Sequence, residues 1–133
     1  MRFLSIFKTV ERTTPPSVEM VGRMQQLIEE SMKSGELVAT EGCLPSVTGA
    51  RVRLDAGKIT VTDGPFTEAK ELIGGFALLE AGSKEEAIAI AKKFLAVAGE
   101  GECEIRQLCN TPASAAVDAA ARQAHLAGEF AKI

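Results

Sequence analysis

The sequence predicts an α+β domain in which strands and helices follow one another as β-α-β-β-α-β, with an inserted β-hairpin and a C-terminal helical tail. Three observations lead to this prediction. Two stretches carry apolar residues at helical spacing, strand-like runs stand on both sides of each stretch, and the last part of the chain is rich in alanine. A chain of 133 residues is long enough to bury a core without disulfides or metals.

The first strand is expected over residues 2–8 and is apolar on both faces. Alternation along a strand places Phe3 and Phe7 on one face and Leu4 and Ile6 on the other. A strand with two apolar faces is expected to be covered on both sides.

The first helix is expected between Ser17, a good N-cap, and Gly35, which suits the C′ position. Apolar residues recur between them at helical spacing, namely Val21, Met24, Leu27, Ile28 and Met32. A second strand follows over residues 37–43, where we expect the odd-numbered residues to share one face.

A hairpin is expected next, because residues 51–54 and 58–62 both alternate and residues 55–57 form a turn. Charged and hydroxyl side chains occupy its solvent-exposed face. We expect Arg51 and Arg53 on this face to be solvated, with an anion site as the alternative.

A strong turn over residues 63–66 leads through a short polar segment to a strand at residues 74–80, which is again apolar on both faces. The second helix begins at Ser83, which forms a capping box with Glu86, and it ends at Gly99. The last strand is expected over residues 102–108.

Without the hairpin, this order is the ferredoxin-like arrangement, in which both helices cover one face of an antiparallel sheet. The other face would be bare, and two of its strands carry apolar residues there. Exposing such a face is unfavourable for solubility. We therefore predict a homodimer through the sheet face, in which two sheets form a dimeric α+β barrel.

We divide the chain into a domain over residues 1–109 and a C-terminal helical extension over residues 110–133. Thr111 and Pro112 suit the start of a helix. Leu126, Phe130 and Ile133 form a small stripe through which this helix is expected to dock on the domain or its partner.

Composition and charge exclude several classes of function. The net charge is −3, so we expect no nucleic-acid partner. No apolar run approaches the roughly 18 residues of a membrane span, and a cytoplasmic protein is expected. Cys43, Cys103 and Cys109 match neither a disulfide framework nor a zinc motif, so buried reduced thiols are expected. Phosphate-loop, dinucleotide-binding, GxSxG and HExxH motifs are absent, and we expect no cofactor and no metal.

The segment over residues 61–76 resembles the pattern of the DGPF-type branch of the YCII-related family. It contains Asp-Gly-Pro-Phe at 63–66, an acid and a lysine two apart, and Gly-Gly-aromatic at 74–76. The resemblance covers about residues 1–109 and implies a dimeric α+β barrel of largely unassigned function. Several members lie in genes next to alternative sigma factors, which implies a regulatory accessory role. A related branch carries a proposed catalytic His-Asp pair, but the one histidine here, His125, lies outside the matched region.

The candidate site residues come from this segment and have two interpretations each. Asp63 is expected to accept hydrogen bonds from the following backbone, and Phe66 to anchor the turn in the core. Alternatively, the turn lines a cleft in which Asp63, Glu68 or Lys70 transfers a proton. The candidate ligand-binding residues are Asp63, Gly64, Phe66, Gly74 and Gly75. The two glycines either bring the backbone close to a ligand or mark a bulge.

Two functional hypotheses follow from these residues. The first is a dimeric module that binds a small ligand or a partner protein and acts as a regulatory accessory. The alternative is a small-molecule enzyme that uses the acid and base groups of the segment in the dimer cleft. A deep pocket that holds Asp63 favours the enzyme, and a turn with satisfied hydrogen bonds favours the module.

Overall fold

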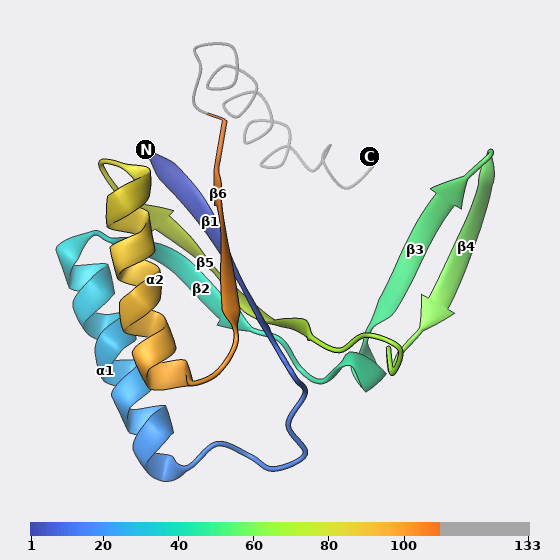
Figure 1. The fold of residues 1–133 in the computed structure, drawn as a ribbon, viewed down its shortest axis with the longest axis horizontal. Coiled ribbons are helices and arrows are strands. Elements are labelled where there is room, and N and C mark those ends of the chain that lie inside the picture. The colour runs from blue at the N-terminus through green and yellow to red at the C-terminus, as the bar shows by residue number, and fades with distance from the viewer. Residues whose placement is uncertain (110–133) are drawn as a thin grey trace, which may run out of the picture.

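The computed structural model describes residues 1–109 (Figure 1). Its elements are β1 (Arg2–Thr9), α1 (Val18–Ser34), β2 (Leu37–Gly42), the short 3₁₀ helix η1 (Ser46–Thr48), β3 (Ala50–Asp55), β4 (Lys58–Asp63), β5 (Leu72–Glu80), α2 (Lys84–Ala98) and β6 (Glu102–Gln107). The predicted helical extension, including His125 and the stripe of three apolar residues, lies outside the described residues.

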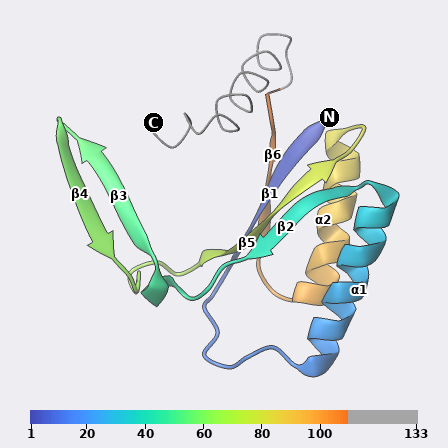
Figure 2. The same cartoon turned by 180° about the vertical axis from the view of Figure 1, so that it is seen from behind.

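The α+β, ferredoxin-like prediction is confirmed. A four-stranded antiparallel sheet has the order β2-β5-β1-β6, and β3 and β4 form a separate two-stranded sheet. Both helices cover the same face of the larger sheet, whereas β3 and β4 extend away on its other side (Figures 1 and 2). One face of the four-stranded sheet is therefore open within the described part of the chain.

The helix boundaries follow the predicted caps. The Ser17 hydroxyl accepts a hydrogen bond from the backbone N–H of Met20 at 3.1 Å, and Gly35 ends α1 in the left-handed conformation at φ 83°. The Ser83 hydroxyl accepts from the N–H of Glu86 at 3.2 Å. The Glu86 carboxylate accepts from Gly82, one residue earlier than in a standard capping box.

The two faces of the sheet differ in their packing. Phe3, Leu79, Ala81 and Ala87 form the buried core between the sheet and the helices. The strand residues that alternate with these core positions point to the open face, where Leu4 is opposite Leu78 and Ile6 is opposite Phe76. Ion pairs border this apolar strip, namely Lys8–Glu104 at 2.8 Å and Arg2–Glu80 at 3.6 Å.

Two bulges interrupt the alternation. Gly74 is the extra residue of one bulge, because Phe7 is opposite Gly75 and Lys8 is opposite Ile73. The second bulge lies in β2 between Leu37 and Ala39. The expectation that the odd-numbered residues of this strand share one face is therefore wrong.

The hairpin is confirmed, with a two-residue turn at Ala56 and Gly57, whose φ angles of 49° and 78° are those of a type I′ turn. At its base, the N–H of Gly64 donates to the carbonyl of Gly49 at 2.9 Å, so the chain returns to the point where it left.

The three cysteines are free thiols in the described region. Cys43 and Cys109 are exposed, so the expectation of buried thiols is wrong for these two. Cys103 is half-buried, and burial raises the pKa of its thiol. No helix within residues 1–109 is long and apolar enough to cross a membrane.

Candidate functional site

The Asp-Gly-Pro-Phe turn lies at the base of the hairpin and packs directly on η1. A Cβ placed on Gly64 would lie only 1.6 Å from the carbonyl oxygen of Ser46, so glycine is required here for the two backbones to approach. This close contact fixes the position at which the hairpin leaves the domain.

Ser46 holds the turn through a hydrogen-bonded chain that begins at Glu11. The Ser46 hydroxyl donates to one carboxylate oxygen of Glu11 at 3.0 Å and accepts from the backbone N–H of Phe66 at 3.1 Å. The N–H of Ser46 donates to the other oxygen of Glu11. Ser46 is buried, so this network replaces water at the turn. Nothing in the sequence marked Glu11 or Ser46, because they lie 35 residues apart and belong to no motif.

The expected roles of Asp63 and Phe66 are corrected by this network. Asp63 is exposed, and its carboxylate accepts no hydrogen bond from residues 1–109. Phe66 is half-buried and lies outside the core. Its ring contacts the Arg51 guanidinium, whose carbon is 3.9 Å from the ring centroid. The turn is therefore held by Ser46 from outside the motif.

Glu68 and Lys70 are both exposed, and the structure does not bring them together into a cleft with Asp63. Glu68 forms an ion pair with Arg51 across the base of the hairpin. The hydrogen bond from Arg51 lowers the pKa of the Glu68 carboxyl. This ion pair therefore supports the folded state above the ordinary carboxyl pKa and is lost as the pH falls through the lowered one.

Ser46→Ala is expected to lower the free energy of unfolding by about 2 kcal/mol, because it leaves the Phe66 N–H and a Glu11 carboxylate oxygen without their partner. Asp63→Ala is the matched control at the same turn and is expected to change stability by less than about 0.5 kcal/mol. Urea unfolding of both variants measures the difference. If Asp63→Ala lowered the free energy of unfolding more than Ser46→Ala does, the Asp63 carboxylate would stabilise the turn as the sequence predicts.

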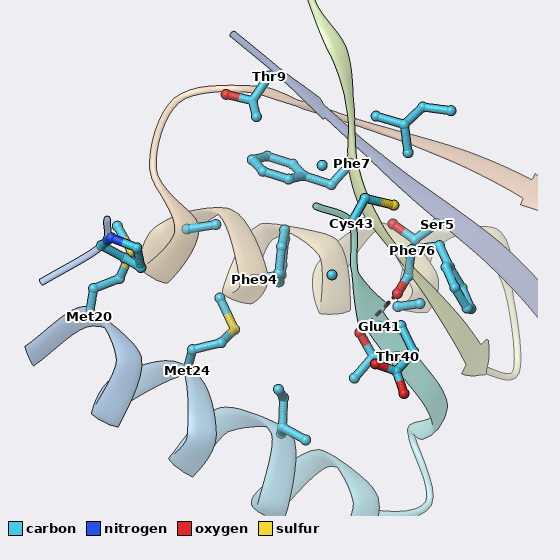
Figure 3. Close-up of a pocket in the computed structure, with 18 of the residues that line it drawn as sticks. Ser5, Phe7, Thr9, Met20, Met24, Thr40, Glu41, Cys43, Phe76 and Phe94 are labelled. Carbon is cyan, nitrogen blue, oxygen red and sulfur yellow. Dashed lines mark hydrogen bonds between the residues drawn. The ribbon is translucent and has the colours of Figure 1, made fainter. Parts of the chain in front are cut away.

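A cavity of about 830 Å³ lies between the helices and the sheet (Figure 3). Its lining is mostly apolar, and Met20 and Met24 of α1 face Phe94 of α2 across it. The Phe7 and Phe94 rings meet edge to face, with centroids 5.1 Å apart. Of these residues, Met24 belongs to the apolar stripe that the sequence predicts for the first helix, and such a stripe looks the same whether it packs against a sheet or lines a cavity.

Gly74 and Gly75 are the two predicted ligand-binding residues that line this cavity. A Cβ on Gly74 would lie 3.2 Å from the Phe7 ring, and one on Gly75 would lie 2.7 Å from the carbonyl oxygen of Glu41. The pair therefore forms a bulge and also lets β1, β2 and β5 close around one end of the cavity. The other candidates, Asp63, Gly64, Phe66, Glu68 and Lys70, do not line it.

Polar residues are a minority of the cavity lining. Ser5 is buried within the lining, and the Thr40 hydroxyl already donates to the carbonyl of Phe76 at 2.9 Å. The charged residues of the lining are all exposed, namely Glu11, Arg12, Glu41 and Lys93. Within residues 1–109, no group of three or more His, Cys, Asp or Glu side chains is placed to hold a metal.

Comparison with known proteins identifies a family and a relative of this chain. The model of the YCII-related domain matches residues 1–111. An uncharacterized protein, R00369, of Rhizobium meliloti (strain 1021) is 35% identical over 78 residues, or 58% of this chain. The match spans 63% of that relative, less than two thirds of its length.

Solved structures are also similar to this chain. Among them is the 5-chloro-2-hydroxyhydroquinone dehydrochlorinase (TftG) from Burkholderia phenoliruptrix AC1100, in complex with 2,5-dihydroxybenzoquinone. The TM-score is 0.40 at 16% identity, and the match covers 84% of this chain and 96% of that one.

Proposed function

The chain belongs to the YCII-related domain family, and from this premise we propose that its domain is a homodimeric module that binds a small molecule in the cavity between helices and sheet. The observation that carries the proposal is the cavity itself. Its volume of about 830 Å³ falls within the range of about 300–1,000 Å³ that is common for small-molecule sites.

The proposed ligand is uncharged and largely apolar. The inner lining combines aromatic rings and methionines, and its charged residues are all exposed. An ion placed against the apolar side chains that make up most of this lining would lose its hydration there. Met20 and Met24 are flexible and polarizable side chains that adapt to ligands of different shape.

We place the chain in the DGPF-type branch on the residues at 61–76, and we assign the turn of this motif a structural role. The hydrogen bonds from Ser46 and the close packing of Gly64 support that role. An enzyme of the alternative kind would need Asp63, Glu68 or Lys70 beside the ligand, and none of the three lines the cavity. We propose that the module acts as a regulatory accessory linked to a sigma factor, as the resemblance implies.

The proposed homodimer forms through the open sheet face. An apolar strip with a border of ion pairs has the usual anatomy of a protein interface, with an apolar centre and a polar rim. A second copy seated on this strip would shield Phe76, which is 40% exposed in the single chain.

Binding of N-phenyl-1-naphthylamine, a neutral apolar fluorophore, tests the ligand proposal. The fluorophore is expected to brighten with the wild-type protein, and Met24→Gln is expected to weaken its binding about tenfold, because a polar amide replaces an apolar side chain in the lining. Met32→Gln is the matched control, since Met32 is exposed on the same helix outside the lining. Equal binding by both variants, or no binding by the wild type, would reject the cavity as the site.

A further inference from the structure

One face of the hairpin carries four aliphatic side chains that residues 1–109 leave uncovered, with Ala50 and Asp63 at its base. Val52 lies opposite Val61, and Leu54 lies opposite Ile59. Each of these four side chains is 64–69% exposed. The opposite face carries Arg51, Arg53 and threonines, so the hairpin is amphipathic, with its apolar face bare.

A bare apolar hairpin is physically unfavourable. A two-stranded hairpin alone is marginally stable in water and needs a packed face to persist. Beyond their own pairing, β3 and β4 have few contacts with other elements of the described region. Contiguous exposed apolar surface of this kind marks an interaction site.

We propose that this hairpin is a dimerisation arm whose apolar face packs on a second copy of the chain. The proposal rests on the proposed homodimer and adds a second contact to it. The hairpin extends on the side of the open sheet face (Figures 1 and 2). The sheet of a second copy bound to that face therefore lies beside the arm. With two-fold symmetry, the arm of each copy packs on the other copy.

A second copy would also bury the exposed apolar side chains of the arm and of the sheet in one interface. A stable dimer needs roughly 800 Å² from each partner. Of the apolar strip on the sheet, Leu4, Ile6 and Leu78 are only partly exposed, and ion pairs border the strip. The four aliphatic side chains of the arm are largely exposed, and packing them on a second copy would add their apolar area to that of the strip.

Sedimentation equilibrium of the full chain tests the arm with two neighbouring substitutions. Val61→Asp places a charge on the apolar face of the hairpin, and Thr60→Asp places the same charge on the opposite face. We expect Val61→Asp to weaken the dimer at least tenfold and Thr60→Asp to leave the dimer constant unchanged. Both positions are exposed, so neither substitution disturbs the domain core.

The outcomes separate the arm from the dimer. A wild-type dimer that Val61→Asp leaves intact would overturn the arm and leave the sheet-face dimer standing, whereas a monomeric wild type would overturn both. A lower melting temperature for Val61→Asp with an unchanged dimer constant would show that the arm is covered within its own chain, and would also overturn the proposal. Amide hydrogen exchange gives an independent reading, because β3 and β4 should be protected only at concentrations at which the wild type is dimeric.

Discussion

Gly64→Ala is expected to lower the free energy of unfolding by about 3 kcal/mol, one of the two largest effects we anticipate. The added methyl group would lie 1.6 Å from the backbone oxygen of Ser46 and 2.6 Å from its carbonyl carbon. Backbone atoms cannot rotate away as a flexible side chain does, so either η1 or the turn must move. Such a movement breaks the hydrogen bond between Phe66 and Ser46 as well.

Gly22→Ala is the matched control for this substitution. Gly22 lies inside α1, and a Cβ there would meet no atom within 4 Å. The same chemical change is therefore expected to raise stability by about 0.5–1 kcal/mol, because alanine is the better helix former. Urea unfolding of the two variants measures the expected loss of stability for Gly64→Ala and the expected gain for Gly22→Ala. A Gly64→Ala protein as stable as the wild type would show that the turn does not pack on η1 in solution.

Phe76→Lys is expected to convert the proposed dimer into monomers, with a dissociation constant raised at least about 100-fold. Two-fold symmetry would bury two ammonium groups at the centre of the sheet-to-sheet contact, where each loses its hydration. The folded single chain should tolerate the change, because Phe76 is already 40% exposed. Glu41 lies directly opposite on β2 and offers the new lysine a cross-strand partner.

Ile88→Lys is the control for this experiment, since Ile88 is 36% exposed on α2, away from the open sheet face. Sedimentation velocity at several concentrations should find Ile88→Lys dimeric like the wild type and Phe76→Lys monomeric. If circular dichroism shows both variants folded and both sediment as the same dimer, the sheet face is not the interface.

The order of the elements was predictable because their local signals agree with one another. Ser17 and Ser83 cap the helices, and the hairpin turn falls at Ala56 and Gly57. In each case the residues that determine the structure are neighbours in the sequence. The two bulges escaped prediction in detail, because a strand pattern does not show where its partner strand slips by one residue.

The candidate site was less predictable, because its geometry depends on contacts between distant segments. The Asp-Gly-Pro-Phe turn was found from its composition, but the residues that hold it come from elsewhere, Glu11 from the loop after β1 and Ser46 from η1. The cavity was hidden for a different reason. The helical spacing of Met24 is the same for a core residue and for a residue that lines a cavity, so the sequence pattern could not distinguish the two. Of the two interpretations given to Gly74 and Gly75, the bulge is confirmed by the pairing of β1 with β5.

The hydrogen bond between Gly64 and Gly49 joins the two ends of the hairpin where they meet the domain. Because the hairpin begins and ends at adjacent points of the domain, the number of residues in it does not affect the register of the four-stranded sheet. Lengthening or shortening β3 and β4 in matched pairs would change how far the hairpin reaches while the rest of the fold stays as it is. The distance to which the hairpin extends from the domain can therefore vary in evolution, or be set by design, independently of the cavity and of the four-stranded sheet.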